Sequence, residues 1–371
     1  MELATKKSKR ILLISFSVRT MNQKKILVTG SSGLIGGEVV KFFCEKDYYV
    51  VGIDNNMREI FFGEKGSTIK NLKRLEKDHI NFINYNIDIR EREIIDELIK
   101  ETKPEIIVHT AAQPSHDKAS AIPFLDFEVN ALGTLNLLES TRKNCKDSPF
   151  IHLSTNKVYG DSPNKIRLKE LEKRWEFEGK FYKKGINELF TIDQSTHSIF
   201  GVSKASSDLM VQEYGRYFDM PTCCLRGGCL TGPSHSGVEL HGFLNYLIRC
   251  NLQKKEYTIY GYKGKQVRDN IHAFDVANFI YLYSQNPKKA AVYNIGGGYK
   301  NSISLIESIS KIEYISGIKM HYKYSDTSRI GDHICYYSDL TKIKEDYPSW
   351  EVSKSLDNIF EEVCEEVISQ I

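Results

Sequence analysis

The sequence predicts an α/β fold organised around a doubly wound parallel sheet, and three observations indicate it. Short apolar segments of strand length alternate with longer amphipathic segments from residue 24 to about residue 155. A glycine-rich turn follows the first apolar segment, and an acidic residue ends the second. At 371 residues, the chain can form one large domain or two intimately joined ones.

The first predicted strand leads directly into the glycine-rich turn. Residues 26–28 form an apolar run typical of a strand buried on both faces. Gly30, Gly33 and Gly36 follow at G-x-x-G-x-x-G spacing, and an amphipathic helix comes next. Glycine lets the backbone approach a pyrophosphate closely, and the helix N-terminus offers it free N–H groups. A glycine triplet alone can also be a structural turn, but in this setting it predicts a Rossmann-type dinucleotide site.

The second predicted strand, residues 48–54, favours one of the two nicotinamide dinucleotides. It ends at Asp54. A carboxylate here can accept hydrogen bonds from the adenosine ribose hydroxyls and would repel a 2′-phosphate. The sequence therefore predicts NAD rather than NADP.

The following elements continue the alternation. We expect helices at about residues 67–77, 92–100 and 130–140, and strands at 79–88, 106–113 and 150–155. The fourth strand ends in small residues, Ala111 and Ala112, which allow a cofactor to lie against the backbone.

The remainder of the chain predicts a smaller second part. A polar, aromatic-rich insertion between residues 159 and 200 is typical of a lid or binding loop. A helix over 199–218 follows, with Leu209, Met210 and Tyr214 at core-facing spacing. We divide the chain into a disordered extension (1–23), a dinucleotide-binding domain (24–220) and a mainly substrate-binding domain (221–371) interleaved with the last strands of the sheet.

Composition excludes several classes of function. The formal net charge of +3 implies no general attraction to nucleic acid or to a membrane surface. The apolar run 11–18 is far too short to span a bilayer. Eight scattered cysteines without paired spacing indicate reduced thiols in a cytoplasmic protein, with no metal site.

Four further motifs stand together with the glycine-rich turn. They are Ser154-Thr-Asn-Lys-Val-Tyr-Gly160, Phe200-Gly-Val-Ser-Lys204, the stretch 264–275 (GKQVRDNIHAFD) and Arg329-Ile-Gly-Asp332. The ordered set resembles the extended short-chain dehydrogenase/reductase family, and within it the nucleotide-sugar epimerases and dehydratases. The resemblance extends over nearly everything from residue 24 onward.

The resemblance implies that NAD is the cofactor and places it on particular residues. The residues implied to contact it come from the glycine-rich turn, the ends of the strands and two helices: Gly30, Ser32, Gly33, Leu34, Ile35, Gly36, Asp54, Asn55, Asp88, Ile89, Ala111, Ala112, Gln113, Asn130 and Lys204.

The implied chemistry has one departure. Thr155 matches the residue that hydrogen-bonds the reacting hydroxyl, and Lys204 matches the lysine of the family's Tyr-x-x-x-Lys motif, but the tyrosine position is Phe200. A phenyl ring cannot carry the proton. Another group then takes it, the protein binds without appreciable turnover, or the base sits opposite a different carbon.

Four candidates could replace the missing base. They are His197, His116, Tyr159 and Thr155 acting through water, and our hypothesis is His197, within about one helical turn of Phe200. For a lone histidine, an ordinary surface or core position is equally compatible with the sequence.

The substrate side carries positive charge where a diphosphate would lie. Arg268 and Arg329 match family arginines that clamp the pyrophosphate, and Asp269 and Asp332 would orient them or meet the nucleotide ribose. The residues expected to bind substrate are His116, Thr155, Asn156, Arg226, Arg268 and Arg329.

Two positions argue against a dehydratase. Family dehydratases carry Asp-Glu after the active-site threonine, whereas this chain has Asn156 and Lys157, which cannot do the work of paired carboxylates. The resemblance therefore favours epimerisation of a nucleotide-diphosphate sugar, most similar to enzymes acting at C2 of a CDP-dideoxyhexose. It also implies a homodimer, with helix 199–218 at the interface. The alternatives are a dehydrogenase or reductase releasing a keto-sugar, and a binding protein impaired by Phe200.

Overall fold

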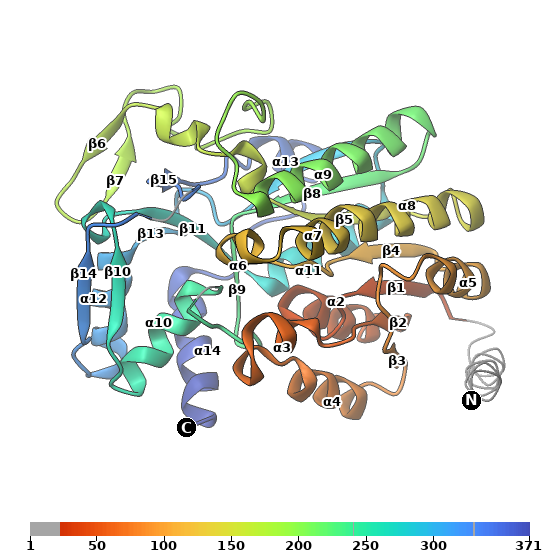
Figure 1. Cartoon of the computed structure of the whole chain (residues 1–371), viewed down its shortest axis with the longest axis horizontal. Coiled ribbons are helices and arrows are strands. Elements are labelled where there is room, and N and C mark those ends of the chain that lie inside the picture. The colour runs from red at the N-terminus through yellow and green to blue at the C-terminus, as the bar shows by residue number, and fades with distance from the viewer. Residues whose placement is uncertain (1–22, 240, 329–330) are drawn as a thin grey trace.

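A computed structural model describes residues 23–239, 241–328 and 331–371 (Figure 1). Two expectations therefore lie outside the described residues: the extension up to residue 22, and Arg329 as a substrate ligand.

A seven-stranded parallel sheet confirms the predicted fold class. The strand order β12-β8-β5-β4-β1-β2-β3 is doubly wound around β1, with neighbours on both sides. The strands are β1 (Lys25–Thr29), β2 (Tyr49–Ile53), β3 (Phe82–Tyr85), β4 (Ile106–His109), β5 (Phe150–Thr155), β8 (Thr222–Gly227) and β12 (Ala291–Ile295). β3 and β4 are shorter than expected, because the polar and small residues after them leave the sheet and line a pocket.

Helices cover both faces of the sheet (Figure 1). Ile26 and Val28 belong to a core with α2 (Leu34–Cys44) and α11 (Ala273–Gln285), whereas Leu27 belongs to the core on the opposite face. That second core is closed by α5 (Arg92–Thr102), α8 (Gly133–Asn144) and α9 (Ile199–Tyr217). The apolar run 26–28 is thus buried on both faces, as its composition predicts.

The orientation of α9 differs from the prediction. Val211 and Tyr214 are buried against the sheet, but Leu209 and Met210 are 47% and 38% exposed, so their assignment to the core is wrong. Apolar residues occur around most of this helix, and periodicity alone therefore did not single out the buried face.

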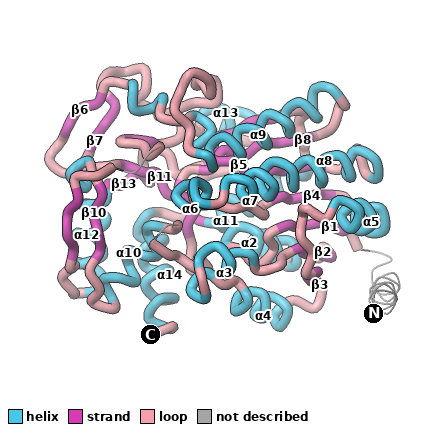
Figure 2. The backbone as a smooth tube through the Cα atoms, in the orientation of Figure 1, coloured by secondary structure: helices cyan, strands magenta, loops and turns pink. Residues whose placement is uncertain are grey.

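A smaller part is built mainly from the C-terminal third of the chain (Figure 1), and Figure 2 shows the strands and helices that form it. Its strands form a parallel pair, β10 (Tyr257–Tyr260) with β14 (Tyr322–Ser325), and a four-stranded group of β9 (Cys229–Thr231), β11 (Val267–His272), β13 (Ser302–Ser304) and β15 (Cys335–Tyr336). A separate core lies among α10 (Phe243–Leu252), α12 (Leu305–Ser316) and α14 (Leu356–Ser369). β8 and β12 belong to the large sheet although they come after residue 220.

The remaining elements are short. The insertion carries a small hairpin of β6 (Leu168–Glu170) and β7 (Trp175–Phe177). The other helices are α3 (Met57–Phe62), α4 (Ile69–Asp78), α6 (His116–Ala121), α7 (Pro123–Phe127), a π-type turn η2 (Glu128–Leu132), α13 (Thr341–Asp346), and the 3₁₀ turns η1 (Glu64–Gly66), η3 (Asn156–Tyr159), η4 (Ser162–Lys165) and η5 (Tyr262–Gly264). Within the described ranges, none of the helices has the length and apolarity that crossing a membrane would require.

Candidate active site

A single long pocket runs along the carboxyl ends of the large sheet's strands and into the smaller part. Gly30, Asp54 and Thr110 follow β1, β2 and β4, and Thr155 ends β5. β9, β10 and β11 of the smaller part complete the wall. Ligands of doubly wound sheets bind at this edge, where neighbouring connections leave in opposite directions.

The glycine-rich turn leaves no space for side chains. Gly30 has φ +67°, and a Cβ there would lie 2.8 Å from the backbone nitrogen of Ala111. A Cβ on Gly36 would lie 2.0 Å from Gly30 O, so this glycine lets α2 start directly against the turn. Gly30 and Gly33 line the pocket, and the N-terminus of α2 faces it. This cradle fits a pyrophosphate.

The acid after β2 is held in position by the same turn. Asp54 accepts hydrogen bonds from the backbone N–H groups of Ser32 (2.9 Å) and Asn56 (2.8 Å). Burial raises the pKa of the Asp54 carboxyl, while these hydrogen bonds oppose that shift. Asp88 also lines the pocket, where Arg90 and Asn55 donate to it.

Most of the predicted cofactor residues line this pocket. Those that do are Gly30, Gly33, Leu34, Ile35, Asp54, Asn55, Asp88, Ile89, Ala111, Ala112 and Lys204. Ser32, Gly36, Gln113 and Asn130 do not line it. Gln113 and Asn130 are buried and hydrogen-bonded to each other, and Asn130 also donates to Asp126. Ser32 and Gly36 shape the glycine-rich turn, whereas Gln113 and Asn130 shape the loop after β4.

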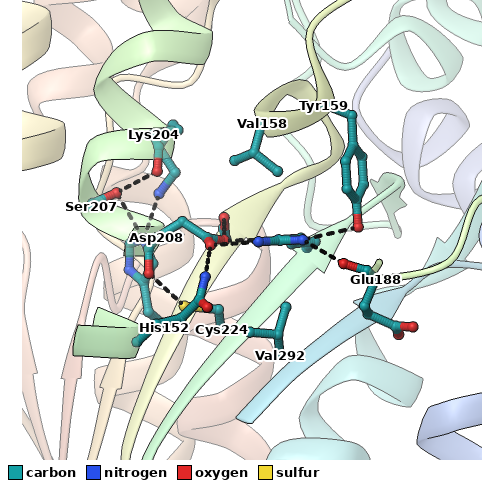
Figure 3. A network of polar contacts seen from close by, with 12 residues as sticks. His152, Val158, Tyr159, Glu188, Lys204, Ser207, Asp208, Cys224 and Val292 are labelled. Carbon is teal, nitrogen blue, oxygen red and sulfur yellow. Dashed lines mark hydrogen bonds and ion pairs between the residues drawn. The ribbon is translucent and has the colours of Figure 1, made fainter. Parts of the chain in front are cut away.

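Thr155, Phe200 and Lys204 line the pocket at its middle. Lys204 Nζ donates to Leu153 O at 2.7 Å. It also lies 3.2 Å from Nε2 of His152, and Figure 3 shows these two side chains together. Phe200 is one turn earlier on α9 and is 7% exposed. The Thr155 hydroxyl oxygen accepts from the backbone of Lys157.

His197, the residue expected to act as the base, lies outside the pocket. Its Nε2 lies 2.7 Å from Val158 O and its Nδ1 3.2 Å from Ser195 O, and the residue does not line the pocket. Tyr159 also lies outside, with its hydroxyl donating to Asn294. His116 does line the pocket, on the side where it interacts electrostatically with Asp332 and His241.

A cationic cluster lines the substrate end. Arg268 and Lys157 both contact Asp332 Oδ1, at 2.7 and 3.1 Å. Burial would raise the pKa of Asp332, but the two cations outweigh it and hold the pKa well below its ordinary value. The cluster carries two cations for one carboxylate. Sequence reasoning missed Lys157 as a member, although its place two residues after Thr155 was the available signal.

Two predicted substrate-side residues lie elsewhere. Arg226 is buried outside the pocket, where it makes a bidentate ion pair with Asp208 at 2.9 and 3.1 Å. Its Nη1 also donates to the Tyr159 hydroxyl at 3.2 Å, and its guanidinium carbon lies 5.1 Å from the centre of the Tyr159 ring. The Asp269 carboxylate accepts from the backbone N–H groups of Gly298 and Ser338, which indicates a structural role. By contrast, the predicted Asn156 lines the pocket.

Arg58 is a pocket residue without a sequence signal. From α3 it donates to Ser236 O at 2.9 Å and lies 3.4 Å from His241 Nδ1. Burial lowers the pKa of Arg58 to about 10, and the charge of Asp54 opposes that shift. His235 lies beside His241, but no group of three or more metal-ligating side chains occurs among the described residues.

The fold and the pocket together define a dinucleotide-binding α/β protein. The chain belongs to the NAD dependent epimerase/dehydratase family, whose model matches residues 26–296. The family is NAD-dependent, which agrees with the cradle and with Asp54.

Individual relatives differ in their reactions. The chain is 31% identical over 326 residues to a CDP-paratose 2-epimerase of Salmonella typhi, covering 86% of this chain and 92% of that protein. It is 27% identical to a dTDP-glucose 4,6-dehydratase of Neisseria meningitidis serogroup B, covering 87% of each. Among solved structures, the UDP-glucose 4-epimerase of Thermotoga maritima with UDP-glucose has a TM-score of 0.73 at 25% identity, covering 93% of this chain and 99% of that one.

Proposed function

We propose that the chain is an NAD-dependent epimerase of a nucleotide-diphosphate sugar, with a CDP-sugar favoured. The observation that carries this proposal is the presence, in one continuous pocket, of an NAD cradle, Thr155 with Lys204, and the Arg268–Lys157–Asp332 cluster. The 31% identity with a CDP-paratose 2-epimerase supports the choice of nucleotide.

The residues have separate roles in this proposal. Arg268 and Lys157 hold the diphosphate, because guanidinium and ammonium groups suit its charge. Thr155 orients the hydroxyl that is oxidised, and Lys204 lies at the same part of the pocket. When bound, NAD supplies the acceptor and then the donor of the hydride. Return of the hydride to the opposite face of the keto-sugar completes the epimerisation.

The residues after Thr155 support epimerisation over dehydration. Asn156 and Lys157 both line the pocket, at positions where dehydratases of the family use two carboxylates. An amide and an ammonium cannot deliver a proton to a leaving hydroxyl and remove one beside a ketone.

Phe200 favours a second candidate function. If no group in the pocket replaces the tyrosine, the protein binds NAD and a nucleotide sugar without turnover. Release of the keto-sugar by a dehydrogenase that exchanges its cofactor remains the third possibility.

One experiment separates the three. The protein is purified without added cofactor, the bound nicotinamide is measured after denaturation, and the holoprotein is incubated with CDP-, UDP- and dTDP-hexoses. Near-stoichiometric NAD with an epimerised sugar supports the proposal. Keto-sugar with net consumption of added NAD indicates the dehydrogenase, and binding without product indicates the binding protein.

We also propose a homodimer through α9. Its exposed apolar side chains, Val202, Leu209 and Met210, share one helical face. Light scattering should give twice the chain mass, and Leu209→Lys should shift it toward one copy.

A further inference from the structure

Lys204 is a buried lysine with no ion-pair partner among the residues that the structure describes. Its side chain lies at the pocket wall, yet the residue is only 3% exposed. Its amine donates a hydrogen bond to Leu153 O and contacts the ring of His152, which Figure 3 shows beside it. Within the described ranges, no carboxylate comes within 4 Å of its amine. A buried ammonium in such surroundings is destabilised relative to the neutral amine.

The two nearest carboxylates are committed to other groups. Asp208, one turn later on α9, accepts from Arg226, from Gln212 and from the Ser154 hydroxyl. Asp126 on α7 accepts from Ser203, Gln113 and Asn130. Arg226 offsets the charge of Asp208, so this carboxylate stabilises the Lys204 ammonium less than an unpaired carboxylate would.

His152 is compatible with both protonation states of this lysine. A ring nitrogen can accept a hydrogen bond from an ammonium or, in the other tautomer, donate one to a neutral amine. A carboxylate at the same place would stabilise only the ammonium. His152 is fully buried, and burial holds the pKa of its imidazole well below the ordinary value, so the ring is neutral.

The titratable groups around Lys204 come from five elements. They are Asp208 on α9, His152 on β5, His109 on β4, Asp126 on α7 and Cys224 on β8. Burial has the largest effect and lowers the pKa of the Lys204 amine to about 8, although the acidic neighbours oppose it. At this value, an appreciable fraction of the amine is neutral near pH 8.

Lys204 lies next to the position of the missing tyrosine. Phe200 and Lys204 are spaced i, i+4 on one face of α9, and both line the pocket beside Thr155. His116 lies toward Asp332, at the substrate end. Lys157 already donates to Asp332 and to Gly331 O.

We propose that Lys204 is the general base that replaces the missing tyrosine, an inference that rests on the proposed epimerase function. The neutral amine takes the hydroxyl proton of the substrate and becomes an ammonium, directly or through one bound water. In the same step the carbinol C–H bond breaks and the C–O bond becomes a carbonyl; NAD⁺, which the glycine-rich turn and Asp54 would hold, would accept the hydride. The ammonium returns the proton when the carbonyl is reduced.

The test follows NADH fluorescence in the NAD-loaded protein after mixing with the CDP-, UDP- and dTDP-hexose panel. Four proteins are compared: wild type, F200Y, K204R and F200Y/K204R. Arginine keeps the positive charge but cannot lose a proton. We therefore expect K204R to slow NADH formation about 100-fold or more, while F200Y/K204R stays within about tenfold of F200Y, because the tyrosine there is the base.

The pH profile gives a second readout. The wild-type rate should rise through pH about 8, where Lys204 loses its proton, and F200Y should shift this rise. The matched control is Lys342→Met, a lysine that also donates to a strand carbonyl, Val292 O, but does not line the pocket. It should leave rate and profile unchanged.

Three results would overturn the inference, and they are distinguishable. If K204R forms NADH as fast as wild type, the base lies elsewhere. If F200Y forms NADH and the wild type does not, Lys204 does not replace the tyrosine. The proposed epimerase function is still supported in that case. If neither forms NADH with any sugar of the panel, the proposed function fails and the inference fails with it.

Discussion

Two buried ionic clusters in this protein have opposite characters. In the first, Asp208 pairs with Arg226, and their side chains are 1% and 4% exposed. In the second, Asp332 is shared by Arg268 and Lys157, with side chains 23%, 12% and 15% exposed. The first is balanced and sealed behind the pocket, whereas the second has an excess cation and faces it. The comparison separates a charge pair that stabilises the fold from one suited to bind an anion.

The largest expected effect is a loss of protein stability when the ion pair of the sealed cluster is broken. Asp208→Asn leaves Arg226 buried without its carboxylate and should lower the free energy of unfolding by about 3–5 kcal/mol. Asp332→Asn, the same chemical change in the open cluster, should cost about 1 kcal/mol or less, because water reaches these groups. Urea unfolding of the holoproteins measures both. Equal losses would remove the distinction between the clusters.

The lysine beside the sealed cluster gives the next effect, a dependence of stability on pH. The unfolded chain holds the Lys204 proton up to about pH 10.4, whereas the folded state loses it near pH 8. Since the unfolded state binds more protons between these values, wild-type stability should rise with pH across this window. The stability advantage of Lys204→Met over wild type should therefore shrink by roughly 3 kcal/mol between pH 7.5 and 10.5. If the difference in unfolding free energy between the two proteins stays constant with pH, Lys204 does not titrate in this window in the folded state.

In the open cluster, the effect should appear on ligand binding. Arg268→Gln removes charge-assisted hydrogen bonds to the diphosphate and should weaken binding of CDP about 10- to 100-fold by calorimetry. Stability should change little. Arg249→Gln on α10 is the control, because Arg249 bonds Gln370 and does not line the pocket. Equal affinity in the Arg268 variant would show that the cluster does not hold the diphosphate.

The smallest effect is expected at His197. Both of its ring nitrogens face backbone carbonyl oxygens, so His197→Ala should change NADH formation by less than about twofold. A loss comparable to that of K204R would restore the original hypothesis that His197 is the base.

The dinucleotide turn was easier to predict than the surroundings of Arg226 or the buried face of α9. Gly30, Gly36 and Asp54 act through local backbone geometry and strand order, which spacing along the chain encodes directly. Arg226 was misplaced, since its surroundings depend on Asp208, which lies 18 residues earlier in the chain. Leu209 and Met210 were assigned to the core because local periodicity cannot say which face of a helix meets a sheet.

The sequence by itself determined the sheet, the dinucleotide turn, the choice of NAD and the absence of the usual tyrosine at Phe200. Each depends on residue type at a fixed local spacing, so no long-range information was needed. Only the tertiary structure decided which charges meet. It paired Arg226 with Asp208 and placed His197 outside the pocket. It also buried Lys204 beside His152, where no carboxylate of the described residues forms an ion pair with it. The protonation of a side chain depends on its burial and on neighbours from other elements, and folding alone brings these together.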